Sequence, residues 1–308
     1  MTRPYGTLRR VVACPGERGA IVASAEGPLL HRRRLGDELR RLRGERTLDE
    51  VAEATLISTS KLSRLENGQG VPQPRDVRDL LAYYKLEGAT ADRIRRWAGA
   101  GRSQAWWRGY SAALPATVDV YLDYESGAST IRNWAASIVP PLLETPAYAA
   151  QLYRSIPPVR DEETIRRLVE ILAKRQELLF EQAAAPELIA VVDEAVLHRP
   201  LGTADDHRAQ LDHLYAMSRR PNVFLRVVPF AAGGHAGMQG MFTILQYEED
   251  IDRDIATVES HTGERFFEQH ASLLEYLRLF DAISRKALDH DDSRSLIAAI
   301  RDNPKGPQ

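Results

Sequence analysis

The sequence predicts two domains of different fold class: an all-helical domain at residues 29–104, then an α+β domain with a small mixed sheet at residues 105–288. Short amphipathic segments with helix-capping residues fill the first region, and apolar runs typical of strands appear only from residue 188 onward. The balance of basic and acidic residues also changes at the boundary between the two domains. Residues 29–104 hold 16 basic and 11 acidic side chains, whereas residues 105–308 hold 21 basic and 30 acidic ones. This asymmetry indicates a polyanion-binding module joined to an acidic body.

The composition excludes several classes of protein. The 308 residues are 44% hydrophobic, which is typical of a globular chain, and no apolar run approaches the roughly 18 residues that span a bilayer. Cys14 is the single cysteine, so neither a disulfide framework within the chain nor a cysteine-based zinc site is expected. Residues 1–28 resemble no complete signal peptide, and we expect a disordered extension and a cytoplasmic location.

Five helices are expected in the first domain. The segment 30–43 has leucines at helical spacing and ends before Gly44, while Thr47 and Glu50 form a capping box for a helix from Leu48 to Ala54. Ser58 caps a third helix that ends at Asn67. A fourth follows Pro74, and Thr90 is expected to cap a fifth at residues 91–97.

The second domain begins after a glycine-rich and aromatic seam at residues 98–116. There, Trp106 and Trp107 are expected to pack between the domains rather than form a ligand cage. Helices are expected at 117–135, 144–154, 161–183, 205–219 and 270–288, and strands at 188–192, 223–228, 242–245 and 255–258. Residues 289–308 are expected to form a separate short helix and tail.

Residues 47–68 form a helix, a tight turn and a second helix. A helix that enters the major groove of DNA needs polar side chains outside and apolar ones inside. Leu62 and Leu65 meet the second demand, and the outward side chains are Thr59, Ser60, Lys61, Ser63 and Arg64. The capped N-terminus at Ser58 also suits a phosphate. Two alternatives stay open: a helix-turn-helix used only for protein contact, and a basic arm around Arg32–Arg34 that is simply solvated.

The pattern T-x-x-E-V-A…S-x-S-K-L-S-R-L-E-N-G resembles the lambda-repressor/Cro-like (XRE) helix-turn-helix family of DNA-binding proteins. The resemblance implies base contacts from Thr59, Ser60 and Arg64, and backbone contacts from Lys61, Asn67 and Arg75. It also implies a buried ion pair between Arg41 and Glu66. The full set of expected DNA-binding residues adds Thr47, Ser58, Ser63, Arg40 and Arg43. Leu48 replaces the glutamine of many relatives, and the loop 69–74 has no basic residue, so we expect modest affinity per monomer and reliance on a homodimer.

Four later segments resemble actinobacterial regulators in which this helix-turn-helix precedes a conserved domain of unknown function. They are WWRGYSAALP (106–115), IVPPLLETPAYA (138–149), AVVDEAVLHRPLG (190–202) and RPNVFLRVVPFAAGGHAGMQGMFTIL (220–245), and the likeness extends to YLRLFDAIS (276–284). The resemblance implies a transcription regulator, with some members acting as antitoxin-like partners of a small protein encoded next door.

No catalytic residues, metal or cofactor are expected. The glycine-rich loop 231–237 lacks the lysine of a phosphate loop, and His207 and His213 are spaced wrongly for a shared zinc ion. Asp193 and Glu194 beside His198 are interpreted as either an acid–base cluster or, with more support, a strand end with a capping acid.

Two places in the second domain are candidates for a partner or ligand site. The proline-rich turn 139–146 brings Leu142, Leu143 and Tyr148 together, either as a purely structural turn or as a partner groove. His235 and Met238 lie in a loop between strands, which is either a binding loop or a plain connection.

The sequence therefore predicts a regulator that binds double-stranded DNA, as a homodimer on an inverted repeat with half-sites ~34 Å apart. The acidic domain is expected to dimerise and to receive a signal, with no membrane contact. The alternative is an antitoxin-like protein that sequesters a small partner and regulates its own operon.

Overall fold

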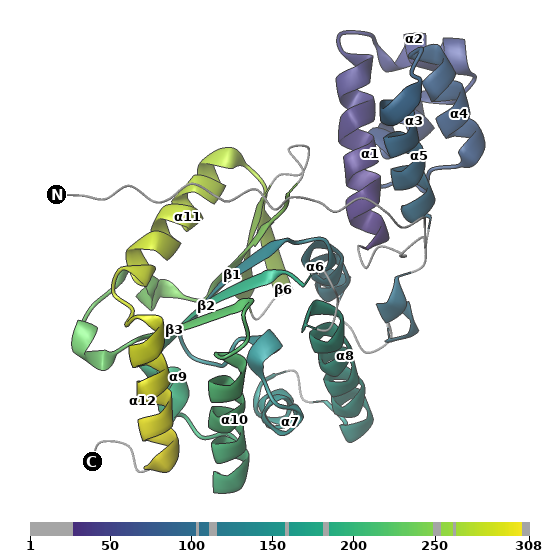
Figure 1. The fold of residues 1–308 in the computed structure, drawn as a ribbon. Helices are drawn as coiled ribbons and strands as arrows, with labels where there is room; N and C mark the ends of the chain where they lie inside the picture. Colours follow the sequence, from purple (N-terminus) through teal and green to yellow (C-terminus); the bar gives the residue numbers. More distant parts are fainter. Residues whose placement is uncertain are drawn as a thin grey trace, which may run out of the picture.

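The computed structural model describes residues 27–102, 105–110, 116–157, 160–180, 185–248, 254–260 and 263–303. A helical domain and an α+β domain are both present, as expected (Figure 1). The extension expected at residues 1–28 lies outside the described residues up to residue 26. Among the described residues, no helix combines the length and apolar character needed to cross a bilayer.

Five helices form the N-terminal domain: α1 (Pro28–Arg43), α2 (Leu48–Thr55), α3 (Thr59–Glu66), α4 (Pro74–Tyr83) and α5 (Gly88–Ala100). Leu35 and Leu39 of α1, at helical spacing, are buried in a core that all five helices share. The expected start of the last helix was wrong. Helix α5 begins at Gly88, so Thr90 lies inside its first turn and Glu87 is the N-cap residue.

A six-stranded mixed sheet organises the second domain, with strand order β3-β2-β1-β4-β5-β6. The strands are β1 (Thr130–Ala135), β2 (Glu187–Asp193), β3 (Val223–Val228), β4 (Phe242–Gln246), β5 (Ile255–Ser260) and β6 (Gly263–Phe267). Strands β1, β2 and β3 run parallel, and β4, β5 and β6 continue the sheet in antiparallel pairs.

Helices cover both faces of this sheet. The α-helices of the domain are α6 (Ala116–Ser126), α7 (Pro146–Ser155), α8 (Glu162–Phe180), α9 (Glu194–His198), α10 (Ala204–Met217), α11 (His270–Ser284) and α12 (His290–Asp302). Short 3₁₀ turns are η1 (Trp106–Tyr110), η2 (Pro141–Leu143), η3 (Phe230–Ala232) and η4 (Ala236–Gln239). Side chains alternate along β2: Leu188, Ala190 and Val192 pack with residues of α7, α10 and α12, whereas Val191 packs with residues of α11. Helix α11 lies on the opposite face of the sheet from α10 and α12 (Figure 1).

Two strands were not expected. The segment 117–135 was expected to be helical throughout, but the helix ends at Ser126 and residues 130–135 form β1, a central strand. Polar residues conceal this strand in the sequence. Arg132 donates to Gln246 Oε1 at 2.6 Å and Asn133 donates to Thr243 Oγ1 at 2.8 Å, so the cross-strand partners that satisfy them are over a hundred residues away. Strand β6 was also missed.

Helix α12 is part of the sheet domain, although residues 289–308 were expected to form a separate segment. Val227 on the edge strand β3 donates its N–H to Ser293 Oγ at 3.0 Å, and its carbonyl accepts the N–H of Leu288 at 2.8 Å. This edge is therefore covered, which removes a site where another strand could pair.

The two domains meet where α1 begins against α6. Asp123 of α6 accepts the N–H groups of Leu29 and Leu30, each at 2.9 Å, and Ser126 Oγ accepts that of Gly27 at 2.7 Å. A Cβ on Gly27 would lie 2.3 Å from Asp123 Oδ1, so only glycine permits this approach. An α6 carboxylate thus caps the helix that starts the N-terminal domain.

A second contact joins the domains one turn further along α1. Arg33 forms an ion pair with Glu268 at 2.7 Å, and its guanidinium lies 4.9 Å from the centre of the Tyr124 ring. The helical domain is therefore attached to the sheet domain through α6 and the segment after β6.

Candidate nucleic-acid interface and ligand pocket

Helices α2 and α3 are fixed at their N-termini by the expected caps. The N–H of Thr47 donates to Glu50 Oε2 at 2.6 Å and the N–H of Glu50 donates to Thr47 Oγ1 at 3.2 Å, which is the reciprocal capping box. Ser58 Oγ accepts the Lys61 N–H at 3.3 Å. Between the helices, Leu56 adopts a left-handed backbone with φ 56°, a conformation that non-glycine residues rarely take.

Helix α3 has one covered side and one open side. Leu62 and Leu65 are each 2% exposed, whereas Ser60 and Arg64 are exposed. Thr59, Lys61 and Ser63 are partly exposed along the rim, and Asn67 is exposed just beyond the helix. The guanidinium of Arg64 has no ion-pair or hydrogen-bond partner among the described residues. A polar surface one helix wide is therefore open to solvent.

Helix α1 sets the position of α3 by close approach. A Cβ on Gly36 would lie 2.6 Å from the carbonyl oxygen of Leu65, so a side chain here would push the helices apart. Arg40 donates to the Glu66 carbonyl at 3.0 Å and to Asn67 Oδ1 at 2.6 Å. Arg40, which was expected to bind DNA, thus also holds the C-terminal end of α3.

The ion pair between α1 and α3 uses a different arginine from the one expected. Arg43, not Arg41, binds the Glu66 carboxylate, through Nε at 2.7 Å and Nη2 at 3.0 Å. Arg41 pairs with Glu38 on its own helix at 2.7 Å. The reason is helical geometry: residues two apart are separated by about 200° around the axis, so both cannot face α3.

A double-mutant cycle will distinguish the two pairings. Removing the Arg43 guanidinium leaves Glu66, which is 7% exposed, without its charged partner, and we expect Arg43→Ala to cost about 2–3 kcal/mol of unfolding free energy. Arg43→Ala and Glu66→Gln should be coupled in urea denaturation. Arg41→Ala and Glu66→Gln should add within about 0.5 kcal/mol, and coupling of that second pair instead would contradict the assignment.

Two of the residues expected to contact the DNA backbone, Lys61 and Arg75, differ in how available their charged groups are. Lys61 is 36% exposed and pairs with Asp76 at 2.7 Å, so a phosphate would compete with a carboxylate for its ammonium. Arg75 is 76% exposed and lies 3.7 Å from Asp79, a loose surface pair. Arg75 is therefore the more available of these two cations.

The expected partner groove at the proline-rich turn is filled by the protein core. Leu142, Leu143 and Tyr148 are 4%, 0% and 1% exposed and pack beneath the sheet. The Tyr148 hydroxyl accepts the N–H of Val139 at 3.1 Å. These three residues have the structural role that was the alternative interpretation, because their side chains offer no surface to a partner.

The other two candidate residues of the second domain, His235 and Met238, do not form a common site with the proline-rich turn. His235 bonds Asp193 at 3.1 Å and packs edge-on against Trp134, whereas Met238 is 71% exposed. Asp193 also caps α9 by accepting the Ala195 N–H at 2.9 Å. The neighbouring pair, Glu194 and His198, lies at 3.1 Å on one helix face. The histidines thus pair separately with acids that have structural roles.

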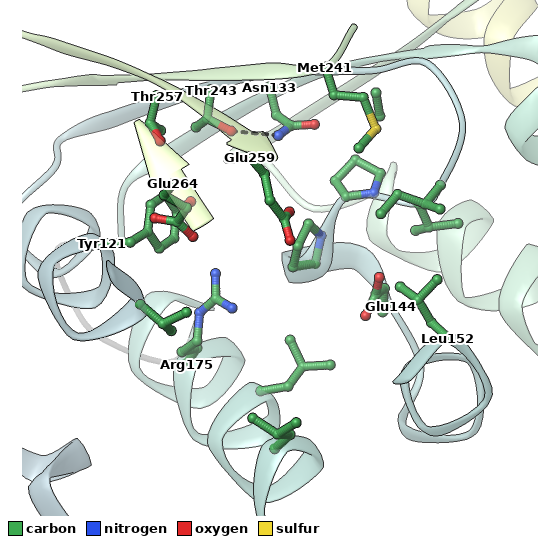
Figure 2. A pocket seen from close by; sticks show the side chains of 18 of the residues that line it. Tyr121, Asn133, Glu144, Leu152, Arg175, Met241, Thr243, Thr257, Glu259 and Glu264 are labelled. Atoms are coloured by element: carbon green, nitrogen blue, oxygen red, sulfur yellow. Dashed lines mark hydrogen bonds between the residues drawn. The ribbon is translucent and has the colours of Figure 1, made fainter. Parts of the chain in front are cut away.

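A cavity of about 200 Å³ lies under the β1–β4–β5–β6 part of the sheet, against α6, α7 and α8 (Figure 2). Its walls are largely apolar, but five polar side chains are prominent among them: Asn133, Glu144, Arg175, Glu259 and Glu264. None of the five was singled out in the sequence. They come from five separate elements, and no spacing rule connects them.

Burial perturbs two of the carboxyl groups in this cavity. Desolvation raises the pKa of Glu144 to about 8, with Arg175 opposing the shift and Glu259 adding to it. Desolvation and the charge of Glu259 likewise raise the pKa of Glu264 to about 8, again opposed by Arg175. Both groups therefore hold a proton through neutral pH, which lets a carboxyl remain in a largely apolar wall.

This protonation makes stability depend on pH. Because the folded-state pKa of Glu144 lies above its unfolded value, the free energy of unfolding is highest below about pH 4.5 and falls as pH rises to about 8. Relative to wild type, Glu144→Gln should therefore gain unfolding free energy over that window, at most about 1.4 kcal/mol per pH unit. Urea denaturation from pH 5 to pH 9 measures this, with Glu187→Gln, an exposed site, as the control. A pH-independent difference for Glu144→Gln would refute the assignment.

Family models match both domains. Residues 34–94 match a helix-turn-helix domain and residues 118–299 match a domain of unknown function, DUF5753. Neither the curated proteins nor the solved structures gave a significant match. The second match covers more than half of the chain and includes the sheet, the cavity and most of α12. The chain therefore belongs to the DUF5753 family and carries a helix-turn-helix domain at its N-terminal side.

Proposed function

We propose that this protein is a sequence-specific DNA-binding transcription regulator that reads its operator with α3. The observation that carries the proposal is the open polar face of α3, with Arg64 exposed while Leu62 and Leu65 anchor the other side. Such a face matches what the major groove requires, and the helical domain has the excess of basic residues that a phosphate backbone attracts. Binding as a homodimer to an inverted repeat is part of the proposal.

Arg64 is proposed to contact bases and Arg75 to contact phosphates. Arg64→Ala should reduce discrimination between the operator and a scrambled duplex by ~1–3 kcal/mol, because a bidentate base contact is lost. Arg75→Ala should instead weaken binding to both duplexes and lower the salt slope by about 1. Mobility-shift titrations at two salt concentrations, with upstream DNA of the gene as operator, measure both effects.

The two arginines control for each other, since both are exposed and lie in the same domain. Unchanged operator preference in Arg64→Ala would remove this residue from the reading set. Absence of any binding by the wild-type protein to its upstream DNA, or to a selected sequence pool, would refute the proposed function itself.

Regulation is proposed to pass through α6. This helix caps α1 through Asp123, while Tyr121 and Glu125 on its other side face α8 and the cavity region. A change in the position of α6 would alter the docking of the whole helical domain, because α1 is the helix on which α3 rests. A signal acts in this way only if it binds two docking states with different affinity.

Asp123→Ala tests this connection in the full chain. Loss of both acceptors leaves the N–H groups of Leu29 and Leu30 without their partner, so these amides should exchange hydrogen faster, by roughly tenfold or more. Operator affinity should change in the same variant. Ser129→Ala, in the same domain but away from α1, serves as a control. Unchanged exchange at α1 would contradict the role given to Asp123.

The antitoxin-like alternative keeps fewer of the candidate residues that were expected to support it. Leu142, Leu143 and Tyr148 are in the core, and of the five candidate residues Met238 alone is strongly exposed. Capture of a small neighbouring protein therefore stays a prediction without a surface assigned to it, and we give the regulator precedence.

A further inference from the structure

The cavity beneath the sheet is bounded on opposite sides by polar groups of one kind. Figure 2 shows Asn133, Glu259 and Glu264 on the sheet side, and Glu144 across the space near Leu152 of α7. Each of these four side chains supplies oxygen acceptors. Oxygen acceptors therefore lie on two sides of the cavity, in a wall that also holds the hydroxyl groups of Thr243, Thr257 and Tyr153.

Three of these acceptors have no donor. Asn133 Oδ1, Glu144 Oε1 and Glu264 Oε2 are fully buried and make no hydrogen bond among the described residues. Glu144 is only 1% exposed, and it lines the cavity. Buried polar atoms are nearly always satisfied in folded proteins, so three unsatisfied oxygens around one space indicate that something else supplies the donors.

The cations of the cavity wall are already engaged. Arg175 binds Glu125 through two hydrogen bonds of 2.8 and 2.7 Å, which neutralises it. Arg160 donates to the carbonyl of Ile156 at 3.2 Å. An anionic ligand would therefore find no available cation in this wall.

The arrangement also fits an extended molecule better than a metal ion. The unsatisfied oxygens lie on separate walls, and no group of three histidine, cysteine, aspartate or glutamate side chains in the described part of the chain converges as metal ligands would. Between the walls are apolar side chains, including Leu152, Leu168 and Leu172. A ligand needs an apolar body in the middle and donors at its edge.

We propose that this cavity binds a small organic amine, with a protonated amino group held by the glutamates and an apolar body packed between α7, α8 and the sheet. An ammonium carries three N–H donors and a positive charge. Beside that charge the raised pKa values of Glu144 and Glu264 would fall, so both groups would accept its hydrogen bonds as carboxylates. A volume of about 200 Å³ limits the body to a short alkyl chain or one aromatic ring.

The same site is placed to act as an effector site. Val118 and Tyr121 of α6 line the cavity, and Asp123 of the same helix caps α1. This second step rests on the proposed function, whereas binding of the amine does not. The two are therefore measured separately.

Binding is tested on the full chain by isothermal titration calorimetry with hexylamine, hexane-1,6-diamine, phenethylamine, hexanol and hexanoate. At least one amine should bind about tenfold more tightly than hexanol, because the ammonium gains charge-assisted hydrogen bonds. Hexanoate should bind most weakly, because its carboxylate loses its hydration and finds no available cation in the wall. Glu144→Gln, which keeps the side-chain shape, should reduce amine affinity about tenfold and leave hexanol unaffected. Glu187→Gln, at an exposed site, should change neither.

Several results would overturn the amine site: no binding by any amine, hexanoate binding as tightly as the amines, or unchanged amine affinity in both Glu144→Gln and Glu264→Gln. Thermal unfolding of each variant confirms that it is folded. Because the two variants lie on different walls of the cavity, the test still stands if one of them fails to fold. Operator affinity with and without the bound amine is then compared. Amine binding without a change in operator affinity would refute the effector role alone, and failure to bind any DNA would refute the proposed function alone.

Discussion

The position of α6 is the constraint on which the two halves of this protein depend. Asp123 accepts two N–H groups from the first turn of α1, an end that Gly27 cannot cap because it has no side chain. The same helix supplies Glu125 to the Arg175 ion pair, where both side chains are largely buried. Small shifts of α6 would break well-formed hydrogen bonds to α1 on one side and to α8 on the other, so the helix has few positions that are compatible with both domains.

The open face of α3 exists because α1 holds the helix from behind. Backbone approach at Gly36 brings the helices close, and Arg43 and Arg40 bind the carboxylate and carbonyl of Glu66. All these contacts lie at the C-terminal half of α3. Its N-terminal half is held by Ser58 and by the turn at Leu56, so the exposed side chains of Ser60 and Arg64 are not needed to hold the helix. A reading surface requires that freedom, since a side chain already committed to a structural contact must break it to reach a base.

Local patterns were sufficient for most of the helical domain, although they misplaced the start of α5. The boundaries of α2 and α3 follow from Thr47, Glu50 and Ser58, whose capping contacts span three residues and are visible in any window of the sequence. The ion pair was wrongly assigned to Arg41 because the resemblance to a family indicates a position in the sequence. It does not show which side of the helix that position faces. Strand β1 was missed because Arg132 and Asn133 look solvent-facing, and their partners on β4 cannot be identified from spacing.

The polar residues of the cavity could not be predicted from the sequence either, because they come from separate elements. The energetic cost of burying two of them is an argument for a function. Glu144 and Glu264 have pKa values raised to about 8 by desolvation, so burying each carboxyl makes the folded state less stable than an apolar residue of similar size would. Neither is paired closely enough with Arg175 to offset that cost, because Arg175 is committed to Glu125. Selection for stability alone would replace such groups. Unsatisfied acid groups facing a shared space are better explained by a molecule that, when bound, supplies the missing donors and restores the lost interactions.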